Sequence, residues 1–401
     1  MMSYFEQLTE WVMKIHGNRV WRGLGLAGLI FLSCGLVGCE IPRVNAEERL
    51  FSHVNLEFIG DYILPRQTVD GTVVGGLSGI VYNRRQERFY AISDDRSDQS
   101  PARFYTLQVQ LNPKTSRIGK VVVESATILK RTDGTPFPKG GIDPEAIAFS
   151  PHHSLYISSE GDRSKGINPF LCEFNLESGQ QQSCLPLPRR YLIQPQEQSS
   201  STLPPQGVQN NLAFESLAIH REGDGEPFRL FTATESALLQ DFDGNVAQQG
   251  ARSRFLHYLI NKTDPPLLVA EHLYPLDFVP LAVVNGLTDF QPLNPAGQFL
   301  GLERAFGPQG FSVKLFQFTT ATATDTSAVP SFKGNLGSLR PIRKRLLLDL
   351  NTLGIHIDNV EGMTVGPRLA DGSQSLLMVS DDNFNQTQVT QFLLFRLIQS
   401  P

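Results

Sequence analysis

Residues 360–365, VEGMTV, together with residues 376–382, LLMVSDD, form one copy of a unit that recurs along the chain. Each copy starts with a short apolar strand, and a second strand that ends on an acid follows about 15 to 20 residues later. Self-similarity at such a spacing is typical of a repeat architecture. The aligned positions in the first strand are 67, 70, 70 and 76 residues apart, at Ser78, Glu145, Glu215, Asn285 and Glu361.

A third strand rich in aromatic and β-branched residues follows in every copy, and a fourth is visible in four of the five. These fourth strands are expected at residues 120–129, near 191–193, at 267–273 and at 343–350. The fifth copy reaches the end of the chain without one, whereas residues 54–64 form a strand that belongs to no copy. Four-stranded units arranged radially, with one terminus completing the last unit, make a β-propeller without free sheet edges. We therefore predict an all-β fold, a single β-propeller of five blades closed by an N-terminal strand, with six blades as the alternative.

Two connections between strands are unusually long and polar. Residues 194–209 are rich in Ser, Pro and Gln, and residues 319–338 are rich in Thr, Ala and Ser. Such compositions favour surface loops.

The N-terminal region has the pattern of an export signal. Basic residues precede an apolar run at residues 24–37, which is shorter than the roughly 20 residues needed to span a bilayer. The run ends in Leu36-Val37-Gly38-Cys39, which resembles a bacterial lipobox and predicts that Cys39 carries lipid. The predicted organisation is a signal peptide at 1–38, a linker at 39–53 and the propeller domain at 54–401. We expect an exported protein of the bacterial cell envelope that meets the membrane only through this anchor; ordinary signal cleavage near residues 44–46 is the alternative.

Export leaves Cys172 and Cys184 as the thiols of the folded part. They lie 12 residues apart and flank a turn-like sequence at 176–179, which suggests a disulfide between neighbouring strands. A pair of unpaired thiols is the alternative. Zinc is disfavoured because no metal-binding spacing of Cys or His accompanies them.

The overall composition is that of an ordinary globular protein, with 401 residues, 40% hydrophobic and 19% charged. The formal net charge of -5 offers no uniformly basic surface, so nucleic acid is not an expected partner. We expect a monomer.

In a propeller blade, the start of the first strand and the end of the antiparallel second strand lie on the same face. The repeat therefore brings acids to one mouth of the central channel, where like charges must hold protons, pair with bases or bind cations. Hard oxygen ligands in this number suit Ca²⁺ better than Zn²⁺. In the alternative reading, each acid only caps a local turn. The candidate ligands are Asp94, Glu145, Glu160, Glu215, Glu235, Glu303, Glu361 and Asp381.

Three arginines in the same loops are candidates for binding an anionic ligand: Arg304, Arg96 and Arg163. Arg304 follows Glu303 directly and is the first choice, although a salt bridge to an acid of the next blade is an equal alternative. The common hydrolase motif GxSxG is missing from the sequence, so no serine nucleophile is predicted.

The strings GGLSGIVYN, FYAISDD, DPEAIAF, FLGLERAFG and LLMVSDDN resemble the phytase-like family, described as having esterase-like activity of phytase. The resemblance covers nearly all of the region after the signal. It implies a β-propeller related to calcium-dependent alkaline phytases, with the eight acids above as candidate calcium ligands.

Two functions remain open at this point. The first is a lipid-anchored, Ca²⁺-dependent phosphoesterase, in which the cation binds the phosphate group and lowers the pKa of an attacking water. The second is a non-catalytic propeller that binds a small phosphorylated or anionic ligand, or a partner, with structural calcium.

Overall fold

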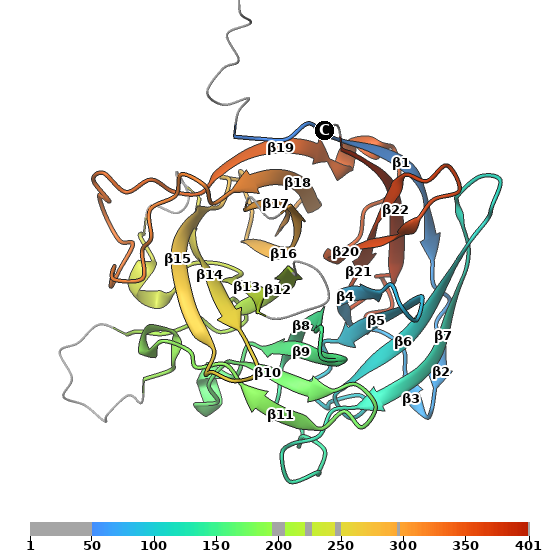
Figure 1. The fold of residues 1–401 in the computed structure, drawn as a ribbon, viewed down its shortest axis with the longest axis horizontal. Helices are drawn as coiled ribbons and strands as arrows, with labels where there is room; N and C mark the ends of the chain where they lie inside the picture. Colours follow the sequence, from blue (N-terminus) through green and yellow to red (C-terminus); the bar gives the residue numbers. More distant parts are fainter. Residues whose placement is uncertain (1–49, 195–204, 221–226, 245–249, 295–296, 400–401) are drawn as a thin grey trace, which may run out of the picture. The chain divides into compact units, whose positions relative to one another are not determined.

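The computed structural model describes residues 50–194, 205–220, 227–244, 250–294 and 297–399. Five four-stranded antiparallel sheets surround a central axis, as Figure 1 shows, and this confirms the predicted five-blade β-propeller. The predicted signal peptide, lipobox and most of the linker lie outside the described residues. Among the described residues, no helix is long and apolar enough to cross a membrane.

The strands of each blade follow one another from the axis outward. Blade one contains β4 (Leu77–Asn83), β5 (Arg88–Ser93), β6 (Arg103–Leu111) and β7 (Ile118–Ile128). Blade two contains β8 (Pro144–Phe149), β9 (Ser154–Ser159), β10 (Phe170–Asn175) and β11 (Gln181–Cys184). Blade three contains β12 (Phe214–His220), β13 (Phe228–Thr234), β14 (Arg252–Ile260) and β15 (Leu267–Pro275). Blade four contains β16 (Val284–Asn294), β17 (Gln298–Gly307), β18 (Gly310–Thr319) and β19 (Arg343–Asp349).

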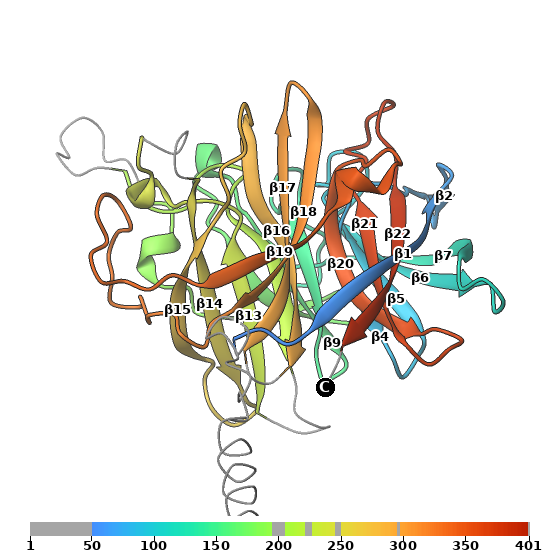
Figure 2. The same ribbon diagram turned by 90° about the horizontal axis from the view of Figure 1, so that it is seen from above.

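Blade five combines the two ends of the propeller: β20 (Val360–Arg368), β21 (Gln374–Ser380) and β22 (Gln391–Gln399) pair in order, and β1 (Val54–Ile63) pairs with β22. The β1–β22 register runs from Val54 opposite Gln399 to Ile63 opposite Gln391. The predicted closing strand is therefore confirmed. This ladder joins the first and the last strand of the propeller, which lie side by side in Figures 1 and 2. Blade five therefore closes the ring of blades without leaving a free sheet edge between β1 and β22. A small hairpin, β2 (Thr68–Val69) with β3 (Thr72–Val73), and four short 3-10 turns, η1 (Arg163–Lys165), η2 (Arg189–Tyr191), η3 (Leu239–Asp241) and η4 (Leu350–Leu353), lie between the blades' strands.

Burial explains the strand patterns. Inner strands such as β9 are buried at every position because neighbouring blades cover both faces, whereas β1 on the outer edge alternates between more and less exposed residues. Aromatic rings fill the space between blades three and four. Phe299 lies 5.3 Å from Phe255 and 4.9 Å from Phe318, measured between ring centroids. Burying each such ring contributes roughly 1.5–3 kcal/mol.

The fourth strand of blade two differs from the prediction. It is β11, and Tyr191 lies instead in the 3-10 turn η2. Two prolines, Pro186 and Pro188, separate β11 from this turn and cannot donate to a ladder. The predicted disulfide is confirmed: Cys172 on β10 and Cys184 on β11 are directly opposite each other and bonded. A disulfide of this kind fits an exported protein.

The long connection at residues 319–338 is a loop at the surface, as predicted, but two of its side chains beyond β18 are buried. Thr319 ends β18, and the segment after it packs against blade three, where Phe332 and Thr326 are fully buried. Its anchor is Arg254, which forms two hydrogen bonds to Asp241, at 2.6 and 2.9 Å, and another to Glu271. The Arg254 guanidinium also lies 3.8 Å from the centroid of the Phe332 ring. An entirely buried ion cluster, rather than composition, holds this segment.

Candidate metal centre

Four blades place a carboxylate at the channel mouth by the same backbone hydrogen bond. Asp94, Glu160, Glu235 and Asp381 each follow the second strand of their blade, and their backbone N–H groups donate to carbonyls just before the first strand. The Glu160 N–H, for example, donates to the Asp143 carbonyl at 3.0 Å. Three further acids, Glu145, Glu215 and Glu361, are the second residues of β8, β12 and β20. The antiparallel pairing of strands one and two therefore brings the acids together.

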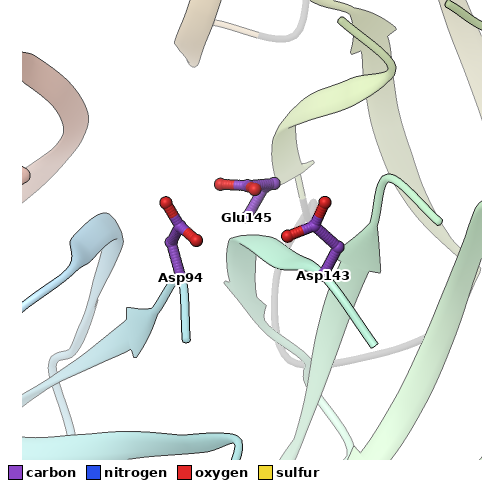
Figure 3. A group of neighbouring side chains, drawn as sticks. All are labelled: Asp94, Asp143 and Glu145. Carbon is purple, nitrogen blue, oxygen red and sulfur yellow. The ribbon is translucent and has the colours of Figure 1, made fainter. Parts of the chain in front are cut away.

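Two groups of three carboxylates are close enough to share an ion. Asp94, Asp143 and Glu145 offer oxygen atoms within 4.8 Å of one another, and Figure 3 shows the three side chains converging. Glu145, Glu160 and Glu215 form the second group within the same limit. Glu145 belongs to both groups and thus lies at the centre of the candidate site.

Burial and mutual repulsion keep these carboxylates hard to ionise. Burial, reinforced by neighbouring carboxylates, raises the pKa of Asp94, Glu145, Glu160, Glu215 and Asp381 well above the ordinary range. Asp143 and Glu235 are each paired with an arginine, yet the effect of burial on their pKa outweighs that of the arginine. Burial raises the pKa of Asp143 to about 6 although Arg96 opposes it, and that of Glu235 to about 7 although Arg304 opposes it. In the absence of a cation, the site therefore holds protons near neutral pH.

Two arginines balance part of the charge. The Arg96 Nε lies 2.6 Å from Asp143 Oδ1, and an Arg304 guanidinium nitrogen lies 2.6 Å from Glu361 Oε1 and 3.6 Å from Glu235 Oε1. Eight carboxylates against two guanidinium groups leave a formal charge of -8 + 2 = -6 when all are ionised.

Several carboxylate oxygens in the site lack a hydrogen-bond partner among the described residues. Asp143 Oδ2 and Glu160 Oε2 are buried and accept no hydrogen bond; Glu235 Oε1 accepts none either, although Arg304 lies 3.6 Å away. Asp143 and Glu160 each belong to one of the two three-carboxylate groups. Buried polar atoms are nearly always satisfied, so these oxygens are exceptions among the described residues.

The structure places Glu303, one of the eight predicted ligands, away from the other seven. Its carboxylate accepts hydrogen bonds from Lys344, from the Tyr274 hydroxyl at 2.7 Å and from the Asp277 N–H at 3.1 Å. The reason is strand register. Glu303 lies opposite Leu287 in blade four, whereas in blade three the equivalent Leu217 lies opposite Thr232, three residues before Glu235.

Blade four contributes Arg304 to the mouth instead. Successive side chains of a strand point to opposite faces, so Glu303 and Arg304 face different neighbours. Opposite Arg304 lies Gly286, where a Cβ would come within 2.2 Å of the Glu235 side chain. Glycine at this position thus leaves the space that Glu235 occupies beside Arg304.

The other predicted anion-binding residues are also engaged. The Arg163 guanidinium donates to the carbonyls of Gln206 at 3.0 Å and Val208 at 3.3 Å, which ties a loop rather than facing the acids. Arg96 bonds Asp143 and also donates to Asn211 at 2.8 Å.

Asp143 is the site residue that the sequence reasoning missed. It lies two residues before Glu145 in the string DPEAIAF, and the equivalent residue in blade five, Asn359, donates to Glu361 Oε1 at 3.0 Å. A search for polar residues two positions before each first-strand acid would have found both.

A family model described as "Phytase-like: Esterase-like activity of phytase" matches residues 72–384. The chain belongs to this family. All eight clustered carboxylates of this phytase-like propeller lie within the matched range. A search of curated proteins finds no match.

Solved structures similar to the phytase-like chain share little sequence with it. An endo-arabinase from Bacteroides thetaiotaomicron is 10% identical, covers 80% of this chain and 94% of its own, and has a TM-score of 0.40. The catalytic domain of a Coprinopsis cinerea GH62 alpha-L-arabinofuranosidase is 11% identical, covers 86% and 97%, and has a TM-score of 0.39. The Malassezia sympodialis allergen Mala s 1 is 12% identical, covers 82% of both chains and has a TM-score of 0.36.

Proposed function

We propose that this chain is an exported, lipid-anchored phosphoesterase that uses Ca²⁺ bound at the carboxylate cluster of its channel mouth. The observation that carries the proposal is the set of unpaired, buried oxygens of Asp143 and Glu160 within two three-carboxylate groups. An all-oxygen donor set without His or Cys is the set that Ca²⁺ prefers. The residues therefore fit the cation that the family resemblance implies.

Asp94, Asp143 and Glu145 would hold one cation, and Glu145, Glu160 and Glu215 a second. A bound Ca²⁺ supplies positive charge that attracts and polarises a phosphate ester. The residues of the chain have two tasks. The carboxylates orient the ions, and Arg96 and Arg304 hold the flanking acids Asp143 and Glu361 in place.

The test is calcium binding and phosphate release by the purified protein. Calorimetric titration of metal-free protein should give saturable Ca²⁺ binding, and hydrolysis of p-nitrophenyl phosphate or phytate should require Ca²⁺. Glu145→Gln removes the carboxylate common to both groups and should weaken Ca²⁺ binding at least about tenfold. Glu124→Gln, on the outer strand β7, is the matched control. Equal phosphate release in Ca²⁺ and in chelator contradicts the proposal.

The runner-up function is a non-catalytic propeller that binds an anionic ligand or a partner. One observation favours it: Arg96, Arg163 and Arg304 all have protein partners, so no predicted anion-binding arginine is left over for phosphate. Tight Ca²⁺ binding without turnover of any phosphate or carboxylate ester would favour this function.

The export part of the proposal rests on the lipobox and the disulfide. Cys39→Ser should move the protein from the membrane fraction to the soluble fraction of the cell envelope. Cys34→Ser, in the apolar run of the predicted signal, is the matched control and should leave it at the membrane. Unchanged fractionation of the Cys39 variant counts against a lipid anchor.

A further inference from the structure

Apolar side chains are exposed beside the carboxylate cluster, in the segment that leads from β15 into β16. Phe278, Leu281 and Val283 are 47%, 72% and 77% exposed to solvent. Phe242, from the loop after η3, is 46% exposed and lies against the same segment. Contiguous exposed apolar residues mark binding surfaces more often than single ones do.

Three of these four residues, Phe242, Phe278 and Val283, line a cavity of about 370 Å³, and Leu281 does not. Phe242, Phe278 and Val283 form its apolar wall together with Leu212. Its polar lining consists of Gln209, Ser236, Asp277 and Asn285. Ser236 directly follows Glu235 in the sequence, and Val284 and Asn285 start β16, so the cavity lies at the same ends of the strands as the clustered carboxylates.

The apolar segment is held in place rather than left to fray. Leu281 has a φ of 63°, which is unfavourable for a residue with a branched side chain, and the Val283 N–H donates to the Phe306 carbonyl at 2.8 Å. The Leu281 carbonyl passes so close to Gly307 that a Cβ there would lie 2.7 Å away. Leu281 does not line the cavity, so this strained backbone fixes the course of the segment that carries Phe278 and Val283.

One polar side chain of the cavity lining is only partly satisfied by hydrogen bonds. The Asn285 side-chain N–H donates to the Asp277 carbonyl at 2.6 Å, but its Oδ1 is buried without a partner. A small-molecule site of this kind combines an apolar wall with a few oriented polar groups, and the volume lies within the usual range of about 300–1,000 Å³. A flat membrane surface would not use a concave wall with a buried amide oxygen.

We propose that this cavity binds the apolar group of a phosphate ester whose phosphate is held at the carboxylate cluster, so that the chain selects aryl or alkyl esters over fully polar ones. The inference rests on the proposed phosphate-binding function and names its ligand class. Phe278 and Val283 are the specificity-determining residues, because they are exposed apolar residues of the cavity lining.

The experiment compares two non-hydrolysable ligands with the same head group, phenylphosphonate and methylphosphonate, by calorimetry of the full chain in Ca²⁺. Phenylphosphonate should bind about tenfold more tightly, which corresponds to about 1.4 kcal/mol. Phe278→Ser and Val283→Ser should remove most of this preference and leave methylphosphonate binding unchanged. Both side chains are about half exposed or more, so the variants should fold. Leu346→Ser, an exposed apolar residue of β19 that does not line the cavity, is the matched control.

The outcomes separate the inference from the function on which it rests. Equal affinity for the two phosphonates overturns the inference and leaves phosphate binding standing. A preference that survives both cavity variants overturns it as well. Ca²⁺-dependent binding of neither ligand overturns the proposed function and the inference with it. Loss of binding to anionic lipid vesicles in the Phe278 variant, with equal phosphonate affinities, would reassign the patch to a membrane surface.

Discussion

Replacing Glu235 by Gln should stabilise the metal-free protein clearly at pH 8 and only slightly at pH 5. Burial raises the pKa of Glu235 from 4.5 in the unfolded chain to about 7 in the folded one, against the opposing charge of Arg304. An acid whose pKa is raised on folding stabilises the fold only while it is protonated. That contribution is lost as the pH rises from 4.5 through about 7.

The magnitude follows from the two pKa values. A pKa difference of about 2.5 units, at 1.36 kcal/mol per unit, corresponds to about 3 kcal/mol of free energy of unfolding. The wild type loses this contribution as Glu235 ionises, whereas the Gln variant keeps it because glutamine cannot ionise. For roughly 350 folded residues at about 2.1 cal/mol/K each, the entropy of unfolding is about 0.7 kcal/mol/K, so the variant should melt about 4 °C above the wild type at pH 8.

The assay is thermal unfolding of the two proteins in chelator at pH 5 and pH 8, followed by circular dichroism. The comparison between variants removes other titrations, notably that of His257, whose pKa is lowered to about 4 first by burial and then by Arg229. The same melting difference at both pH values, or a variant that is less stable at pH 8, would refute the reasoning.

Three further predictions concern the supports of the site and the fold. Arg254→Met should lower the free energy of unfolding by about 3–5 kcal/mol in chemical denaturation, because it leaves the buried Asp241 without a cation and Glu271 with only Arg190 at 3.5 Å, whereas Arg131→Met at the surface should change it little. Serine at both Cys172 and Cys184 should cost about 3 kcal/mol of stability, and reductant should lower the melting temperature of the wild type but not of this variant. Arg304→Met should lower the metal-free melting temperature at pH 8 and increase the stabilisation that Ca²⁺ gives, since Glu235 and Glu361 would then need another cation; an unchanged response to Ca²⁺ would show that Arg304 does not compete with the ion.

The sequence was sufficient for the repeat and its consequences. Strand order, the number of blades and closure by residues 54–64 follow from three elements that recur in register, because propeller geometry leaves few other arrangements. Seven of the eight predicted carboxylates meet at the mouth for the same reason: the end of each second strand is tied to the start of the first by a backbone hydrogen bond.

What the sequence could not predict depends on contacts between distant residues. The anchoring of Thr326 and Phe332 against blade three involves Arg254, Asp241 and Glu271 from different loops and strands, and the composition of the connection does not indicate it. The position of Glu303 depends on strand register, because β17 continues to Gly307 where the corresponding strands of the other blades end. Glu303 therefore occurs at the spacing that the repeat predicts, but it lies three residues before the strand position that reaches the channel mouth in the other blades.

The exception in blade four also divides the site into unlike halves. Arg304 places a permanent positive charge between Glu235 and Glu361, while Arg96 forms its ion pair with Asp143 at the other side of the cluster. The two groups of three converging carboxylates both lie in those blades, and so do the buried unpaired oxygens of Asp143 and Glu160. Exchangeable cations should therefore bind beside Glu145, and the half with Arg304 should face the cavity that holds the rest of the ligand. In a ring of five equivalent acids, a bound ester would have no preferred orientation.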